Sequence, residues 1–102
     1  MAKMRRKPTH PGRILKDHYL EPLNLSITRL AETLDVSRKA VSAIVNEKKS
    51  ITPDMALRLS RAFDTTPDLW ANLQKNHDMW CAENKSENWK AVQKINMEMV
   101  MV

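Results

Sequence analysis

The side chains best suited to chemistry in this chain lie on one face of a single predicted helix, from Arg38 to Asn46. The polar face carries hydrogen-bonding groups at i, i+1, i+4 and i+8, namely Arg38, Lys39, Ser42 and Asn46. The opposite face is an apolar stripe of Val41, Ile44 and Val45. A helix held by one stripe and polar on the other suits the major groove of DNA, where arginine pairs with guanine through two hydrogen bonds. The pattern predicts that Arg38, Lys39 and Ser42 read bases.

Further polar residues flank this helix and are suited to hold phosphates without reading sequence. Ser26 and Thr28 lie at the start of the preceding predicted helix, where free backbone N–H groups favour anions. The remaining phosphate-contact candidates are Ser37, Asn46, Lys48 and Lys49. Ser26 and Ser37 are also expected to cap the helices that follow them. The plainer alternative is that the cations form a solvated surface and that Asn46 only caps the end of its helix.

These residues need a helical framework, and the sequence indicates five helices, at about 11–20, 27–34, 38–46, 53–63 and 67–83. One glycine and five prolines are few turn formers for an all-β chain of 102 residues. Thr52-Pro53-Asp54 and Thr66-Pro67-Asp68 use the same start signal, in which threonine caps, proline begins the helix and aspartate meets the positive end of the dipole. Pro22 is expected to push Glu21 out of the helical region and end the first helix.

Each predicted helix has an apolar side that faces a shared core. The expected core residues are Ile14, Leu15 and Tyr19; Ile27, Leu30, Ala31 and Leu34; and Met55, Leu59, Ala62 and Phe63.

The last helix carries more apolar area on one side than a small core requires, with Leu69, Trp70, Leu73, His77, Trp80 and Cys81. Because aromatic residues are enriched at interfaces, we expect a dimer interface there, with packing inside the chain as the alternative. Its residues would be Trp70, Leu73, His77 and Trp80.

Charge divides the chain unevenly. Residues 1–49 carry 11 Lys/Arg and 5 Asp/Glu, a net of +6, whereas residues 50–102 carry 6 and 7, a net of −1, so the first half supplies the whole net charge of +5. A basic half suggests an anionic partner.

The single cysteine fits a reducing cytoplasm, and no apolar run is long enough for a membrane span. We expect a basic arm at 1–9, a helix-turn-helix domain at 10–83 and a tail at 84–102 that ends in a Met-rich stretch.

Metal-binding and catalytic patterns are weak by comparison. His77 and Cys81 are spaced as two ligands on one helix, but two ligands do not make a zinc site, and neither His10 nor His18 has a matching motif. The sequence shows no nucleophile–base set and no glycine-rich phosphate loop. It therefore predicts a protein that is not an enzyme and that needs no metal or cofactor.

The segment from Leu30 to Asn46 resembles the helix-turn-helix of the phage-repressor-like (XRE) family. The matching residues are Leu30-Ala31, Val36-Ser37, Val41-Ser42, Ile44 and Asn46. More narrowly, four segments resemble HigA-type antitoxins, a subgroup that includes virulence-associated protein I. They are His10–Leu15, Glu21-Pro22-Leu23, Ile51–Leu59 and Thr66–Gln74. The resemblance covers about residues 8–80 and implies an all-α, five-helix, lambda-repressor-like DNA-binding domain with short flexible tails.

The resemblance also implies a function. It implies a homodimer that binds an inverted-repeat operator of its own operon and that neutralises a partner toxin, a HigB-type mRNA nuclease. Three residues depart from the family pattern: Asp35 replaces the glycine of the turn, Ile27 a glutamine, and Glu47 a glycine after the third helix. Asp tolerates the left-handed conformation, whereas Ile27 removes a polar contact and Glu47 brings a carboxylate toward the DNA. The alternatives are a solitary XRE-type regulator and a protein-binding antitoxin with little DNA specificity.

Overall fold

The computed structural model describes residues 6–96, which are helical and contain no strand. The elements are α1 (Pro11–Leu15) with the π-helical turn η2 (Lys16–Leu20), α2 (Ile27–Leu34), α3 (Arg38–Val45), α4 (Pro53–Phe63), α5 (Pro67–Lys85) and the 3-10 turn η3 (Asn88–Ala91). The five helices expected from the sequence are confirmed. Residues 1–5 and 97–102, which include much of the expected arm and the Met-rich stretch, lie outside the described residues.

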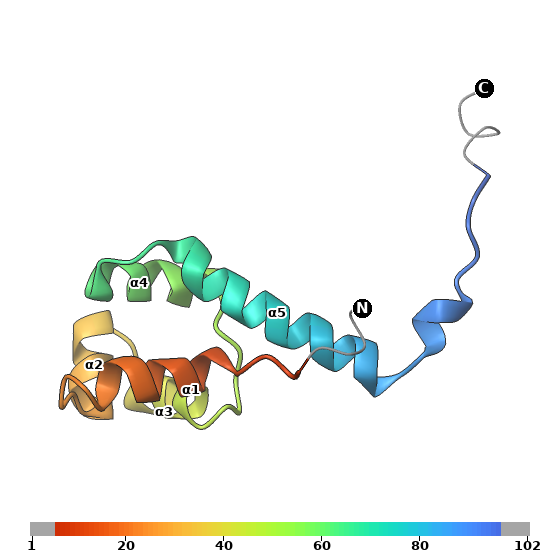
Figure 1. Cartoon of the computed structure of the whole chain (residues 1–102). Coiled ribbons are helices and arrows are strands. Elements are labelled where there is room, and N and C mark those ends of the chain that lie inside the picture. Colours follow the sequence, from red (N-terminus) through yellow and green to blue (C-terminus); the bar gives the residue numbers. More distant parts are fainter. Residues whose placement is uncertain (1–5, 97–102) are drawn as a thin grey trace.

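The helices surround one core (Figure 1). α3 packs against α1 and α2, and α5 packs against α4 and α1. α5 continues past the other helices, and the chain after it leads away from them to η3. No helix within residues 6–96 is long and apolar enough to cross a membrane. The arrangement leaves α2 and α3 together at one side of the body, with α4 beside them.

Each of the five helices begins at a side chain that accepts a hydrogen bond from the first turn. The four expected caps are confirmed: Ser26 accepts from Arg29 N–H at 3.0 Å, Ser37 from Ala40 at 3.0 Å, Thr52 from Met55 at 3.2 Å and Thr66 from Leu69 at 3.2 Å. The fifth cap is His10, whose Nδ1 accepts from Gly12 N–H at 2.9 Å. The sequence did not indicate a role for His10, although a proline directly after it marks a first helical position.

Four helical segments end at a non-glycine residue in the left-handed conformation. These residues are Asn24, Asp35, Glu47 and Asp64, with φ of 53°, 57°, 63° and 54°. At Asp35 the turn closes with Val36 N–H donating to Ala31 O at 3.1 Å, so the expectation that aspartate adopts this conformation is confirmed. Asparagine and aspartate visit this region more readily than other non-glycine residues, which leaves Glu47 as the most strained of the four.

The end of the first helix differs from the expectation. Glu21 keeps helical angles, with φ −67° and ψ −50°, and the chain reverses only at Asn24. The expectation that Pro22 drives Glu21 out of the helical region is therefore wrong. The hydrogen bonds here reach the fifth residue, as from Glu21 N–H to Lys16 O at 3.0 Å. This wider π turn tolerates a following proline ring better than an α turn, in which the ring meets the carbonyl four residues earlier.

The core corrects two side-chain assignments. Trp70 is 0% exposed, packs beside Tyr19 and donates from Nε1 to Thr65 Oγ1 at 2.9 Å. A side chain enclosed within its own chain cannot form a dimer interface, so the assignment of Trp70 to that interface is wrong. On α4, Ala62 is exposed and Ala56 is buried in its place. Ala56, Leu59 and Trp70 all belong to the one buried core.

Gly12 lets two helices approach closely. A Cβ atom at this position would overlap the carbonyl oxygen of Ile44 and lie 2.8 Å from its carbon. The start of α1 therefore packs directly on the backbone of α3. Gly12 has ordinary helical geometry, so its role is the absence of a side chain rather than a left-handed turn.

Candidate nucleic-acid interface

The α2–turn–α3 unit is fixed on both sides. Its inner side contributes Leu30, Leu34 and Val41 to the core. On its outer side Arg58 of α4 donates from Nη1 to Leu34 O at 2.7 Å and to Asp35 O at 3.4 Å. Arg58 also donates from Nε to Asp54 at 2.8 Å, and that hydrogen bond raises the pKa of the guanidinium. Sequence reasoning missed this role of Arg58 because the carbonyl groups that it contacts, on Leu34 and Asp35, lie 24 and 23 residues earlier in the chain.

The first turn of α3 presents the expected base-reading cations. Arg38 and Lys39 are both exposed. Arg38 Nε donates to Thr28 Oγ1 at 2.9 Å, which ties the start of α3 to the start of α2. The structure thus brings together a residue predicted to read bases and a residue predicted to hold a phosphate. Thr28 orients the guanidinium, whose remaining N–H groups stay available for a guanine or a phosphate.

The other hydroxyl candidates serve the helices themselves. The hydroxyl oxygens of Ser26 and Ser37 accept the capping bonds described above. Each hydroxyl keeps its one O–H group to donate to another acceptor. Asn46 Nδ2 donates to Ser42 O at 2.9 Å and to Ser42 Oγ at 3.2 Å. Asn46 is therefore the C-cap of α3, and Ser42 is engaged by the same amide.

The lysines around α3 are not engaged in this way. Lys39, Lys48 and Lys49 are exposed, and none of them forms an ion pair with another residue of the 6–96 range. The backbone N–H groups of Lys48 and Lys49 both donate to Ala43 O, at 2.8 and 3.2 Å, which folds the chain back at the end of α3. This fold keeps both lysines next to the helix, where they add positive charge beside the polar face.

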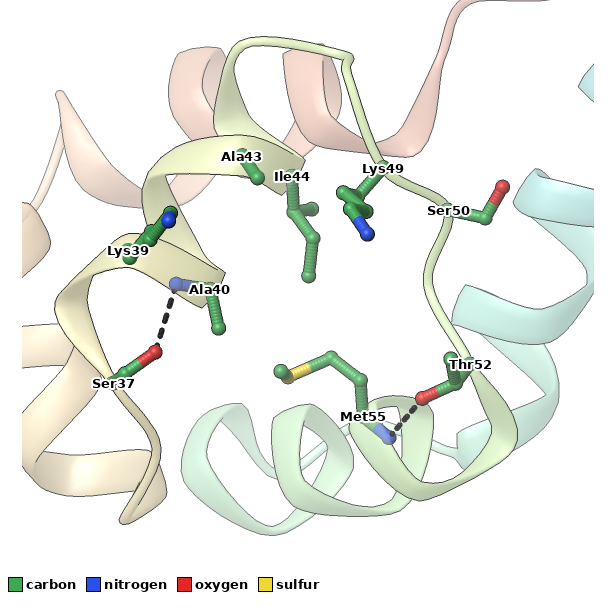
Figure 2. Close-up of a pocket in the computed structure, with 9 residues that line it drawn as sticks. All are labelled: Ser37, Lys39, Ala40, Ala43, Ile44, Lys49, Ser50, Thr52 and Met55. Carbon is green, nitrogen blue, oxygen red and sulfur yellow. Dashed lines mark hydrogen bonds between the residues drawn. The ribbon is translucent and has the colours of Figure 1, made fainter.

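A groove of about 410 Å³ lies between α3 and the segment leading into α4 (Figure 2). Its floor is apolar, with Ala40, Ala43, Ile44 and Met55. Its rim is polar, with Ser37, Lys39, Lys49, Ser50 and Thr52. Sequence reasoning missed the groove, since it forms only where the segment leading into α4 passes beside α3. The charged rim extends the basic surface that begins at Arg38.

A family model described as helix-turn-helix matches residues 18–70, which span α2, α3 and α4. The chain belongs to the helix-turn-helix family. This helix-turn-helix protein is similar to two curated bacterial relatives. An uncharacterized HTH-type transcriptional regulator, YbaQ of Escherichia coli (strain K12), is 52% identical over 84 residues, 82% of this chain and 74% of the relative. Antitoxin HigA-1 of Vibrio cholerae is 35% identical over 85 residues, 83% of this chain and 80% of the relative.

A solved structure supports the same assignment. The Pseudomonas aeruginosa antitoxin HigA, solved with the higBA promoter, matches the helix-turn-helix protein with a TM-score of 0.77 and 38% identity. The match covers 86% of this chain and 98% of the other. The resemblance to HigA-type antitoxins and the five-helix DNA-binding fold are therefore confirmed.

Two residues that depart from the family pattern, Ile27 and Glu47, have structural explanations. Ile27 is partly buried and packs on the core, so hydrophobic contact replaces the polar contact at the start of α2. Glu47 lies near α1, where its charge acts on His10 and Arg13. Arg13 has its pKa raised first by its hydrogen bond to Asp17 and, to a smaller extent, by Glu47. The cations of α1 thus partly offset the Glu47 carboxylate.

The side chains of His10, at the start of α1, and His77, on α5, pack against each other. Their rings lie 4.8 Å apart, edge to face, and Cys81 Sγ is 3.9 Å from His77 Nδ1. Burial lowers the pKa of His10, and the charge of His77 lowers it further. This keeps the imidazole neutral, as its capping acceptor role requires. Within residues 6–96, no three His, Cys, Asp or Glu side chains gather as metal ligands.

Proposed function

We propose that this protein is a repressor that binds as a homodimer to an inverted-repeat operator in its own promoter. The observation that carries the proposal is the first turn of α3, where Arg38 and Lys39 are exposed beside α2 while Val41 and Ile44 anchor the helix in the core. A helix held in this way presents its N-terminal side chains to base edges in the major groove. A dimer then reads two half-sites about 10 base pairs apart, or a multiple of that spacing.

The proposed roles follow from the contacts. Arg38, oriented by Thr28, would read a base, with Lys39 and Ser42 beside it. Lys48 and Lys49 would hold phosphates, together with the helix starts at Ser26, Thr28 and Ser37. Asn46 would act mainly through its hydrogen bonds to Ser42. The HigA relative that was solved with promoter DNA supports this arrangement. The proposal includes a cytoplasmic location, where the DNA target lies.

The test is fluorescence anisotropy of a labelled duplex from the protein's own promoter, against a scrambled duplex, at two salt concentrations. We expect tight binding to the promoter and weak binding to the scrambled sequence. Arg38→Ala should reduce the difference in binding free energy between the duplexes by about 1–3 kcal/mol per half-site, the discrimination of one bidentate contact. Lys48→Ala should weaken binding to both duplexes and lower the salt slope by about one per subunit.

Lys85→Ala is the matched control, since Lys85 lies in the last turn of α5, away from α3. It should leave both affinities and the salt slope unchanged. Binding that is equal on the two duplexes and disappears with salt would show that only charge is sensed, and it would refute a sequence-specific repressor. Unchanged preference in Arg38→Ala would remove α3 as the reading helix.

We propose that the dimer surface lies along the C-terminal half of α5. With Trp70 enclosed in the core and Leu73 packed against it, the candidates that keep exposed area are His77 and Trp80, and Met79 is 52% exposed between them. Light scattering of the free protein, and titration with a duplex that holds a single half-site, measure the oligomeric state. A monomer that binds one half-site as tightly as the full operator would exclude the homodimer.

We further propose that the protein is an antitoxin that neutralises a HigB-type mRNA nuclease. The support is its 35% identity to antitoxin HigA-1 over four fifths of both chains. Co-expression with a toxin frame beside its gene should restore growth that the toxin alone arrests. Arg38→Ala should still restore growth while repression is lost, because the DNA-reading side chain need not contact the toxin.

A solitary regulator without a toxin is the second candidate. The relative YbaQ, at 52% identity, is described only as an uncharacterized transcriptional regulator. The two candidates differ in gene neighbourhood and in co-purification. Selective promoter binding without a neighbouring toxin frame, and without a co-purifying nuclease, would favour the solitary regulator.

A further inference from the structure

Two alanines lie on the outer side of the proposed reading helix. Ala40 and Ala43 are partly exposed and form the α3 side of the groove in Figure 2. Their positions follow from the helix register, since Val41, Ile44 and Val45 point into the core and at about 100° per residue Ala43 lies on the side turned away from them, with Ala40 at its flank. Side chains on this part of a reading helix approach DNA together with Lys39, which borders the same groove.

The chemistry of these positions is restricted. An alanine methyl neither donates nor accepts a hydrogen bond, so Ala40 and Ala43 have only apolar contact to offer. Among the groups that bases display in the major groove, the C5-methyl of thymine is the apolar one. Ile44 and Met55 continue the apolar floor beneath them, so the side chains of the floor offer no hydrogen bond to guanine, cytosine or adenine, and the polar side chains lie at the rim.

The charges around the groove suit the same partner. In Figure 2, Lys39 stands on α3 at one edge, and Lys49 stands at the other edge on the segment that leads to α4. Neither lysine forms an ion pair within residues 6–96. An apolar floor between two free cations complements a thymine methyl flanked by phosphates. An acidic protein segment would also meet the cations, but Lys39 lies next to Arg38, so the groove is continuous with the proposed DNA surface.

We propose that Ala43, with Ala40 beside it, is a specificity-determining residue that recognises the C5-methyl group of a thymine in each operator half-site. The methyl packs on the two alanine side chains, between Lys39 and Lys49. This inference rests on the proposed operator binding and adds one base to what α3 reads. It predicts that the preferred half-site contains a thymine whose identity is set by shape rather than by hydrogen bonds.

The test replaces the thymines of one half-site of the promoter duplex, one at a time, by deoxyuridine, which removes the C5-methyl and nothing else. One substitution should weaken binding of the full-length protein by about fourfold, the value of one buried methyl-sized group. In Ala43→Gly the unmodified duplex should bind more weakly, and the difference between thymine and deoxyuridine at that position should vanish.

Ala82→Gly is the matched control, because it makes the same change at an exposed position of α5. It should keep the full thymine preference, and circular dichroism checks that both variants stay folded. A deoxyuridine scan without any effect on the wild-type protein would overturn this inference while leaving selective binding intact. An effect that persists unchanged in Ala43→Gly would overturn it as well. Loss of selectivity on the unmodified promoter duplex would instead refute the operator function itself.

Discussion

The contact between α1 and α3 at Gly12 predicts a large effect from one added methyl group. In Gly12→Ala the new Cβ would overlap the carbonyl oxygen of Ile44 and lie 2.8 Å from its carbon. Both partners are backbone, so a side-chain rotation cannot relieve the overlap and α1 must move away from α3. Overpacking of this kind costs about 1–3 kcal/mol, and the better helix propensity of alanine returns at most about 1 kcal/mol.

Taking the upper end, because backbone has to shift, we expect a net loss of about 2 kcal/mol in the free energy of unfolding. For a domain of this size the melting temperature should fall by about 8–16 °C. The urea midpoint should fall by about 1 M. The displaced α3 should also bind the promoter duplex more weakly at a temperature where the variant remains folded. Thermal and urea unfolding by circular dichroism measure the first two quantities, and anisotropy measures the third.

Asn72→Ala is the control, since it raises helix propensity at an exposed position of α5 without changing a contact between helices. It should leave stability unchanged or raise it by a few tenths of a kcal/mol. A Gly12→Ala variant as stable as the wild-type protein would refute the reasoning, because it would mean that α1 and α3 separate without cost. Lower stability with unchanged operator affinity would show that α1 does not set the position of α3.

Two further predictions concern His10 and Glu47. The pKa of His10 is lowered in the folded chain, so the unfolded chain binds more protons. The free energy of unfolding should therefore fall as the pH drops below about 6.5 toward the pKa of the folded chain. The slope should be at most about 1.4 kcal/mol per pH unit. His10→Asn keeps an acceptor for Gly12 N–H and should lose this part of the pH dependence in unfolding titrations; an unchanged pH profile would contradict the role of His10. Glu47 has a φ of 63°, so Glu47→Gly should remove backbone strain and raise the free energy of unfolding by about 1 kcal/mol. Glu47→Gln removes the charge but keeps the strain, so both variants should bind all duplexes more tightly while only the glycine variant melts at a higher temperature.

Helix starts were predictable because the interactions that set them are local. The capping residues Ser26, Ser37, Thr52 and Thr66 each bond to an N–H three residues later, and such signals can be read from adjacent letters. The alternation of faces on α3 followed in the same way from helical periodicity. The expected outward position of Arg38 and Lys39 therefore agrees with the structure, as does the left-handed turn at Asp35.

The starts of the helices, their apolar sides and the helix that carries the cations could all be predicted from local patterns, because each depends on residues within one or two turns. The contacts of the apolar surplus of α5 depend instead on how the helices pack, and this packing encloses Trp70 within the chain. The same packing also decided the bond from Arg58 to Leu34, the crossing at Gly12 and the groove over Ala43. These features join elements far apart in sequence, so their geometry depends on how whole helices pack, and no local pattern encodes it.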